Sequence, residues 1–276
     1  MSEPDRRLTT RIRSVFGFTS MPFAKGLDPE HLFATDAYRN ALDRLRYLGD
    51  RRGIGAVFGA PGTGKSTLIR SFLGSLGKAT HAIAYIPFSS CSVVELFRQI
   101  AFAFQIEPRF RKADLARDLS ERILKLSRTQ KLTALLVIDD AHLMTASVLD
   151  DLRLLTSFDG DSRDDLTLLL AGQPQLESQL RLATNEALAQ RIVLKVRLRS
   201  LHPEEVSAYL THRLEIAGRT ARLFLPEAVE AIAKGSRGIP RLVDRLADHS
   251  LLLALRDKKK EIDAEIVTEA IDEVEP

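Results

Sequence analysis

The stretch GAPGTGKS occupies residues 59–66 and decides the fold of this 276-residue chain. It matches the pattern G-x-x-x-x-G-K-[ST] through Gly59, Gly64, Lys65 and Ser66. The apolar run before it, IGAVFG, predicts a buried strand, and STLIRSFLGSLG after it predicts a helix that ends at glycine. A glycine-rich turn between a strand and a helix is the context that confirms this pattern as a phosphate-binding loop.

The residue types of the loop suit a nucleotide. Glycines let backbone N–H groups turn inward around phosphates, and the positive end of the helix dipole adds to the attraction. Lys65 is expected to reach the β- and γ-phosphates of ATP, and the Ser66 hydroxyl to ligate Mg²⁺. An alternative is a glycine turn that carries Lys-Ser by chance. The predicted ATP-binding residues of the loop are Gly59, Pro61, Gly62, Thr63, Gly64, Lys65, Ser66 and Thr67.

A second apolar run ends in two adjacent carboxylates, in the stretch VIDDAH (137–142). Unpaired charge at the end of a buried strand is costly to desolvate, so these carboxylates need a partner. Asp139 is expected to be neutralised by Mg²⁺ and the phosphate-binding loop. Asp140 is then the candidate that orients and deprotonates the attacking water. The alternative for Asp140 is a helix N-cap for the following segment.

Apolar runs with strand character alternate with helical segments over residues 36–198, which predicts a parallel sheet covered by helices on both faces. The predicted strands are 54–59, 81–88, 132–139, 166–172 and 192–198. The predicted helices are 36–50, 66–77, 93–104, 113–130 and 145–157, with helical turns near 175–190.

After Ser200 the strand pattern stops, and four helical segments follow, two of which begin at Pro203 and Pro226. The predicted organisation is a loosely held N-terminal arm (1–25), an α/β core (26–200) and a helical lid (201–276). The stretch FGFTSMPF (16–23) is the first cluster that could dock on a core. The basic side chains of the arm have no assigned role: Arg6, Arg7, Arg11 and Arg13.

Composition excludes several classes of protein. Hydrophobic residues make up 45% of the chain and charged residues 28%, which is typical of a folded globular protein. The single cysteine, Cys91, allows no disulfide framework and favours a reducing compartment. The six histidines follow no zinc-binding spacing. No apolar run is long enough for a membrane span and the N-terminus lacks a signal-peptide core, so we expect a cytoplasmic protein without a membrane partner.

The net charge is only +3, but basic residues concentrate between Arg98 and Lys131, where nine stand against four acidic ones. A locally basic face allows duplex DNA as a partner, although solvated helix faces by themselves are the simpler explanation. From Glu261 to the end there are seven acidic residues and no basic ones.

The order of these motifs resembles an AAA+ ATPase. More narrowly, the chain is similar to the ExeA/GspA-like ATPases and to the related TnsC/TniB-type transposition ATPases. The stretches that carry the resemblance run almost end to end: FGFTSMPF, GAPGTGKST, VIDDAH, LRLLTSFDGDS, LLLAGQPQL, EALAQRI, AYLTHRLEIAG and GIPRLVDRLADHSLLLA. The phosphate-binding loop is shared by many families, whereas GQPQL, AQRI and GIPR at these spacings are more specific together.

The resemblance implies further roles. Gln173 in GQPQL corresponds to the residue that senses the γ-phosphate, and Arg191 in AQRI to an arginine finger that projects into a neighbouring subunit. Arg241 in GIPR corresponds to the arginine of the lid that senses nucleotide, and Phe33 to a side chain lining the adenine pocket. Simpler alternatives are a turn cap for Gln173, a surface arginine for Arg191 and a helix start for Arg241. An arginine finger implies self-assembly, as a hexameric ring or a helical filament.

One position departs from the family pattern: Asp140 stands where most relatives carry glutamate. Aspartate is shorter by one methylene, roughly 1.5 Å of reach, and catalytic geometry is sensitive on that scale. We therefore expect slow ATP hydrolysis, which suits a switch better than a processive motor.

The function that the resemblance favours is an ATP-dependent DNA-binding regulator of transposition. Such a protein assembles on target DNA and recruits or activates a transposase or target-selection protein. The DNA contacts are expected at Arg109, Arg111 and Lys112, where related rings present DNA-facing loops. The alternatives are a secretion or envelope-assembly ATPase of the ExeA/GspA type and a STAND-like signalling switch. Both add domains that are absent after the lid of this sequence.

Overall fold

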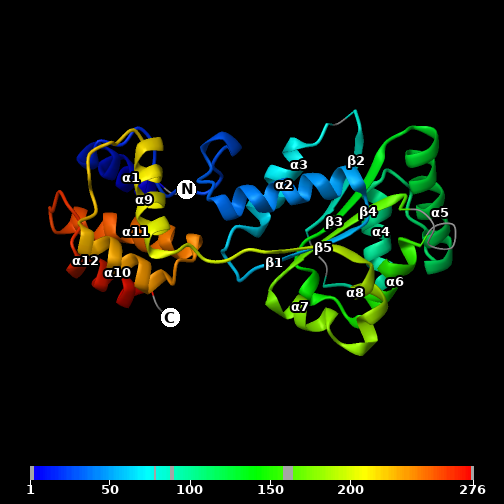
Figure 1. Cartoon of the computed structure of the whole chain (residues 1–276). Coiled ribbons are helices and arrows are strands. Elements are labelled where there is room, and N and C mark those ends of the chain that lie inside the picture. Colours follow the sequence, from blue (N-terminus) through cyan, green and yellow to red (C-terminus); the bar gives the residue numbers. More distant parts are fainter. Residues whose placement is uncertain (1–2, 78, 88–89, 158–163, 275–276) are drawn as a thin grey trace. The chain divides into compact units, whose positions relative to one another are not determined.

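The computed structural model describes residues 3–77, 79–87, 90–157 and 164–274, with side chains from residue 7 onward. The chain divides into two compact units (Figure 1). The sheet unit comprises Asp36–Leu198, and the helical unit comprises Met1–Thr35 together with Arg199–Pro276. Each unit has a hydrophobic core of its own.

The sheet unit is built on five parallel strands in the order β2-β3-β4-β1-β5. The strands are β1 (Ile54–Phe58), β2 (His81–Ile86), β3 (Thr133–Ile138), β4 (Leu166–Gly172) and β5 (Ile192–Arg197). Phe58 pairs with Gly172, and Ile138 pairs with Leu170. This register brings the residues that follow β1, β3 and β4 to one edge of the sheet.

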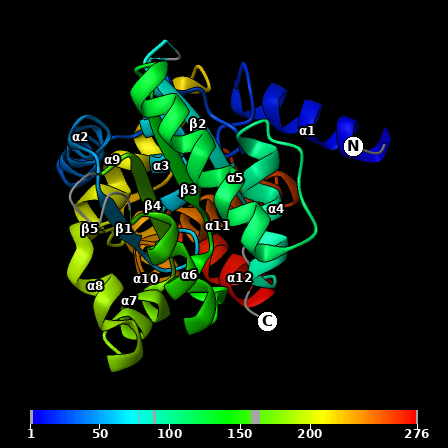
Figure 2. The ribbon, with the colours of Figure 1, turned by 90° about the vertical axis from the view of Figure 1, so that its right-hand side faces the viewer.

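Helices cover both faces of the sheet, as the sequence predicts. One face packs against α4, α5, α6, α7 and α8, and the other packs against α2 and α3. Figure 2 shows the strands with α4 and α5 on one side and α2 on the other. The helices are α2 (Asp36–Arg51), α3 (Lys65–Ser75), α4 (Val93–Ala103), α5 (Lys112–Leu124), α6 (Ala146–Leu155), α7 (Pro174–Leu180) and α8 (Glu186–Arg191).

Two predicted helices differ in detail. The helix expected over 113–130 is α5 followed by a π-helical segment, Lys125–Thr129. The turns expected near 175–190 are α7, the 3₁₀ turn Ala183–Asn185, and α8. Residues 158–162 of the stretch TSFDGDS lie outside the described residues.

The helical unit contains all four helices expected after Ser200 and one that was not expected. They are α1 (Glu3–Phe16), α9 (Pro203–Ile216), α10 (Pro226–Ser236), α11 (Pro240–Arg256) and α12 (Ala264–Val274), with a 3₁₀ turn at Pro29–His31.

The N-terminal segment differs from the loosely held arm predicted for 1–25. Ile12, Phe16, Phe18 and Phe23 are buried in the core of this unit. The Arg6 side chain lies outside the described residues.

A buried arginine fixes the N-terminal segment to the helices of this unit. Arg213 of α9 is 3% exposed and donates to the carbonyl oxygens of Pro22 (2.7 Å) and Ala24 (2.9 Å). It also donates to the Tyr209 hydroxyl (2.7 Å) and the Asp244 carboxylate (3.1 Å). Burial raises the pKa of the Asp244 carboxyl to about 6. A buried cation is stable only when it is paired and hydrogen-bonded. The hydrogen bonds of Arg213 therefore require the backbone at Pro22 and Ala24 to stay in its present position.

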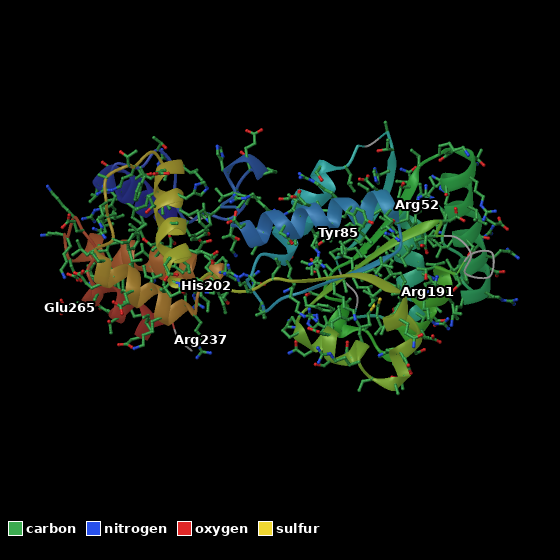
Figure 3. The ribbon with its side chains drawn as sticks, viewed as in Figure 1. Arg52, Tyr85, Arg191, His202, Arg237 and Glu265 are labelled. Atoms are coloured by element: carbon green, nitrogen blue, oxygen red, sulfur yellow. The ribbon has the colours of Figure 1, made fainter. Side chains whose placement is uncertain are left out.

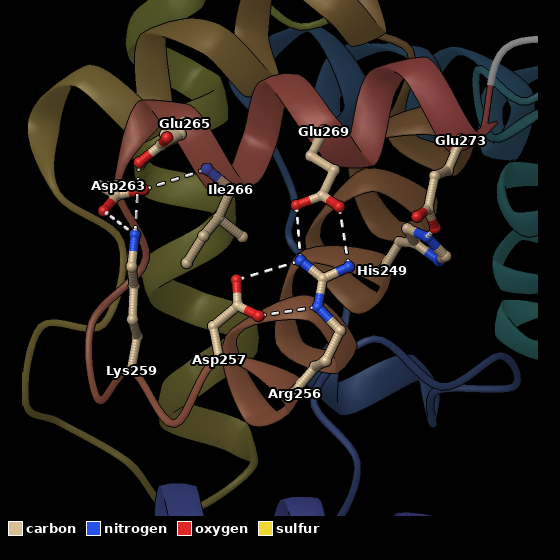
Figure 4. Close-up of polar contacts among 9 residues, drawn as sticks. All are labelled: His249, Arg256, Asp257, Lys259, Asp263, Glu265, Ile266, Glu269 and Glu273. Carbon is tan, nitrogen blue, oxygen red and sulfur yellow. Dashed lines mark hydrogen bonds and ion pairs between the residues drawn. The ribbon is translucent and has the colours of Figure 1, made fainter.

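The acidic end of the sequence is engaged within the same unit. Arg256 of α11 donates to both carboxylate oxygens of Glu269, at 2.8 and 2.7 Å (Figure 4). Lys259 pairs with Asp263 at 2.7 Å, and His249 contacts Glu273 at 2.5 Å. The Arg256 and His249 contacts connect α11 to α12, and the Lys259–Asp263 pair lies in the connection between the two helices. In the described part of the chain, no helix is long and apolar enough to cross a membrane.

Candidate nucleotide and magnesium site

The phosphate-binding loop joins the end of β1 to the start of α3 and needs its glycines. Gly62 (φ +84°) and Gly64 (φ +97°) adopt backbone conformations that side chains rarely allow. A Cβ on Gly59 would lie 2.6 Å from the Thr63 hydroxyl oxygen. The loop geometry therefore depends on glycine at Gly59 and Gly64, which the motif fixes, and at Gly62, which the motif leaves open.

Lys65 lies inside this loop, with only 8% of the residue exposed. Its Nζ donates to the carbonyl oxygens of Gly59 (2.8 Å) and Ala60 (3.2 Å). Within the described residues, the backbone amides of Gly62 and Gly64 donate no hydrogen bond. A buried ammonium beside two such amides fits the phosphates of a nucleotide.

Asp139 follows β3 and meets Ser66 at the sheet edge. It is 6% exposed, and its Oδ2 accepts from the Ser66 hydroxyl at 3.1 Å. Its Oδ1 accepts from the backbone N–H of Asp140 at 2.9 Å. A carboxylate and a hydroxyl fit Mg²⁺, which in phosphate sites uses one or two protein ligands and takes the rest from water and phosphate. No larger metal-binding group of His, Cys, Asp or Glu occurs among the described residues.

Tyr85 is a member of this site that sequence reasoning missed. It lies near the carboxyl end of β2, and its hydroxyl donates to the same Asp139 Oδ2 at 3.0 Å (Figure 3). Burial and the negative charge of Asp139 raise the pKa of the Tyr85 hydroxyl to about 12. The strand pairing could have revealed it, because β2 lies beside β3 and both end at the same edge.

Tyr85→Phe is expected to weaken the Mg²⁺-dependent part of ATP binding by about threefold to tenfold, because one hydrogen bond to a charged group is lost. The affinity for nucleotide in EDTA should not change. Fluorescence titration with a labelled ATP analogue, with and without Mg²⁺, measures both values. Equal losses in the two conditions would mean that Tyr85 supports the loop rather than the Asp139 carboxylate.

Asp140 holds an uncommon backbone conformation (φ 51°, ψ 32°) at the start of the 3₁₀ turn Ala141–Leu143. The predicted alternative, an N-cap, has no capping hydrogen bond from the Asp140 side chain. Half of this side chain is exposed, and its Oδ1 lies 3.8 Å from Nδ1 of His142. The Asp140 carboxylate therefore lies beside the proposed Mg²⁺ ligand Asp139, and half of it is open to water.

Gln173 follows the end of β4 at the same sheet edge. The preceding Gly172 accepts a hydrogen bond from the Gly59 amide at 3.2 Å. A Cβ on Gly172 would lie 3.1 Å from the His142 amide nitrogen, so β4, the loop and the segment after β3 meet here. Gln173 is the N-cap residue of α7, but its side chain makes no capping hydrogen bond. A capping role therefore does not explain why glutamine occupies this position.

Arg191 ends α8 and contacts the end of α6 in its own chain (Figure 3). It donates to the carbonyl oxygens of Arg153 (3.3 Å) and Thr156 (3.2 Å) and to the Ser157 hydroxyl (2.7 Å). These are terminal acceptors of a helix, which a guanidinium satisfies well. Arg191 is therefore not an ordinary surface arginine.

Phe33 and Arg241 belong to the helical unit, not to the unit that contains the loop. The Phe33 ring packs edge-on against Tyr209 and tilted against His212, with centroid distances of 5.6 and 5.5 Å. Arg241 is exposed at the second position of α11. A cation there opposes the helix dipole, so starting a helix does not explain why arginine occupies this position.

Two of the three predicted DNA contacts are ion-paired within the chain. Arg109 donates to Asp118 at 3.1 Å, and Lys112 to Asp151 at 2.7 Å. Arg111 is exposed at the N-cap of α5. Asp118 is already counted among the acidic residues of 98–131, whereas Asp151 lies outside that region, so the Lys112 pair offsets one further positive charge.

Residues 48–180 match the family described as AAA domain. The chain is 34% identical over 242 residues to General secretion pathway protein A of Aeromonas hydrophila, a match that covers 87% of the chain and 44% of that protein. The chain thus spans less than half the length of this curated relative.

Solved structures share the fold of this chain. The Aeropyrum pernix ORC2 protein in ADPNP–ADP complexes has a TM-score of 0.67 at 18% identity, covering 91% of this chain and 70% of that one. Drosophila ORC bound to DNA has a TM-score of 0.70 at 15% identity, covering 100% of this chain and 68% of that one. At these identities the likeness establishes the fold, an AAA+ fold with a parallel sheet flanked by helices.

Proposed function

We propose that this protein is an ATP-hydrolysing AAA+ switch. The observation that carries the proposal is the contact of Ser66 with Asp139 beside the buried Lys65, at one edge of the sheet. Ser66 and Asp139 would hold Mg²⁺, which, when bound, neutralises charge on the phosphates. Lys65 would bind the β- and γ-phosphates, and Asp140 would accept the proton of the attacking water. Gln173 and Arg241 are proposed to sense the γ-phosphate and the nucleotide.

The switch is proposed to assemble with copies of itself, with Arg191 completing a neighbour's site. Its contacts with the end of α6 would then hold the guanidinium in place before assembly. ATP turnover per subunit is expected to rise with protein concentration. Arg191→Ala should abolish that rise while single subunits keep ATP affinity. Arg181→Ala, which removes an exposed arginine paired with Glu177, is the matched control. A preserved rise in Arg191→Ala would remove Arg191 from the catalytic assembly.

Of the two candidate cellular roles, secretion or envelope assembly is the better supported. It rests on the 34% identity to General secretion pathway protein A, which extends over 87% of this chain. Sequence identity at that level carries more weight than a likeness of fold.

Regulation of transposition on duplex DNA is the second candidate, and one surface favours it. Phe102 and Phe110 are 77% and 89% exposed on α4 and on the connection to α5. The Arg98 guanidinium lies 5.6 Å from the centroid of the Phe110 ring and donates to the carbonyl oxygens of Arg109 and Phe110. In duplex DNA, phenylalanine side chains can insert between base steps, and arginines contact the phosphates. Assembly on DNA and recruitment of a transposase would follow from such binding.

Binding of labelled duplex DNA in the presence of a non-hydrolysable ATP analogue distinguishes the two outputs. The DNA candidate predicts ATP-dependent binding that falls steeply with salt and weakens in Arg111→Ala. It also predicts faster ATP turnover with DNA. Absence of binding at low salt would discard the transposition role and leave the secretion role in place.

A further inference from the structure

One unpartnered polar atom lies close to the candidate catalytic carboxylate, within a group of connected buried residues. Among the described residues, five buried side-chain N or O atoms have no hydrogen-bond partner, and three of them belong to His142, Gln179 and Asn185. Folded proteins leave few such atoms, and each calls for an explanation. These three residues are connected to one another, which points to one cause.

The connection runs from α7 to the segment after β3. Gln179 donates from Nε2 to the backbone oxygen of His142 at 3.1 Å. Asn185 donates from Nδ2 to the backbone oxygen of Gln179 at 2.9 Å. The first bond holds the main chain at His142, and the second holds the end of α7 from which Gln179 donates.

The His142 side chain is 10% exposed, and its Nδ1 is one of the unpartnered atoms. It lies 3.8 Å from Oδ1 of Asp140, too far for a hydrogen bond. A modest rotation of the half-exposed Asp140 side chain would close this gap. Catalytic hydrogen bonds are often long without substrate and tighten in the reactive complex.

We propose that His142 is a positioning residue whose Nδ1–H donates to the Asp140 carboxylate and aims it at the attacking water. The proton stays on Nδ1, and Asp140 remains the group that accepts the proton of water. This inference rests on the ATP hydrolysis proposed above. The contact matters because Asp140 is shorter than the glutamate at this position in most relatives. A carboxylate displaced by about 1 Å from the attacking water lowers the rate of hydrolysis strongly.

Two substitutions separate positioning from packing. His142→Asn keeps a donor close to the place of Nδ1, whereas His142→Leu keeps the volume without a donor. His142→Leu is expected to lower kcat about tenfold, the size of an orientation effect on a catalytic base, with ATP affinity unchanged. His142→Asn should retain most of the turnover. The opposite order, with Leu active and Asn inactive, would overturn the proposal and assign His142 to packing.

Imidazole ¹⁵N spectroscopy of the full-length protein tests the contact without hydrolysis. The His142 signals are identified as those lost in His142→Asn. With Mg²⁺ and a non-hydrolysable ATP analogue present, Asp140→Ala should shift the His142 Nδ1 resonance and leave the other histidines unchanged. An unmoved Nδ1 resonance would overturn the proposal even if turnover falls. Absence of turnover in the unmodified protein would instead count against ATP hydrolysis, while the spectrum still decides on the contact.

Discussion

Lys65→Ala is expected to weaken ATP binding by at least about 100-fold, because it removes a buried charge that phosphate would otherwise meet. Nζ of Lys65 is held by the carbonyl oxygens of Gly59 and Ala60, so the ammonium is preorganised inside the loop. Alanine leaves the loop backbone unchanged but supplies no charge. Isothermal titration calorimetry with ATP and Mg²⁺ measures the loss.

The matched control is Arg46→Ala, which removes an exposed basic side chain of α2 paired with Asp43. It should bind ATP with unchanged affinity, which shows that net charge is not the cause. The melting temperatures of both variants without nucleotide should stay close to that of the original protein. Normal ATP affinity in a folded Lys65→Ala protein would contradict the assignment of the loop.

Asp140→Asn is expected to keep ATP binding and to lower turnover at least about 100-fold, the lower end of the range for loss of a general base. The amide has nearly the same size as the carboxylate but does not accept a proton from water. Because Mg²⁺ binding is assigned to Ser66 and Asp139, affinity for the nucleotide should stay within about twofold. Subunits should then accumulate in the ATP-bound assembly, which light scattering or electron microscopy detects.

Asp150→Asn is the control for this substitution, since Asp150 is an exposed carboxylate on α6 paired with Arg153. It should hydrolyse ATP normally. Intact turnover in Asp140→Asn would remove Asp140 from the chemistry. Loss of ATP binding in the same variant would show that Asp140 acts on the nucleotide or metal instead.

Local patterns predicted most of the sheet unit. The glycine-rich loop, the five strands and the helices between them follow from motif spacing and from the period of apolar residues. The partnership of Ser66 with Asp139 was also predictable, because a hydroxyl and a carboxylate at the ends of parallel strands meet at one edge. The sequence also indicated the helices after Ser200, from their proline starts and apolar spacing.

Other features depend on contacts between residues far apart in the chain. Phe16 and Phe23 are buried against α9 and α11, which lie about 200 residues later in the chain. Because local apolar patterns do not reveal such distant partners, the sequence predicted a loosely held N-terminal arm. The ion pairs of Arg109 and Lys112 arise from helix packing, which charge counts ignore.

The sequence by itself determined the phosphate-binding loop, the alternation of strands and helices, and the carboxylate that meets Ser66, because each rests on residues close in sequence or just beyond the ends of parallel strands in one sheet. Only the tertiary structure showed that Tyr85 donates to Asp139, that Gln179 of α7 donates to the His142 backbone, and that Arg191 contacts the end of α6. Strand order and helix packing set those distances, and no local pattern encodes them.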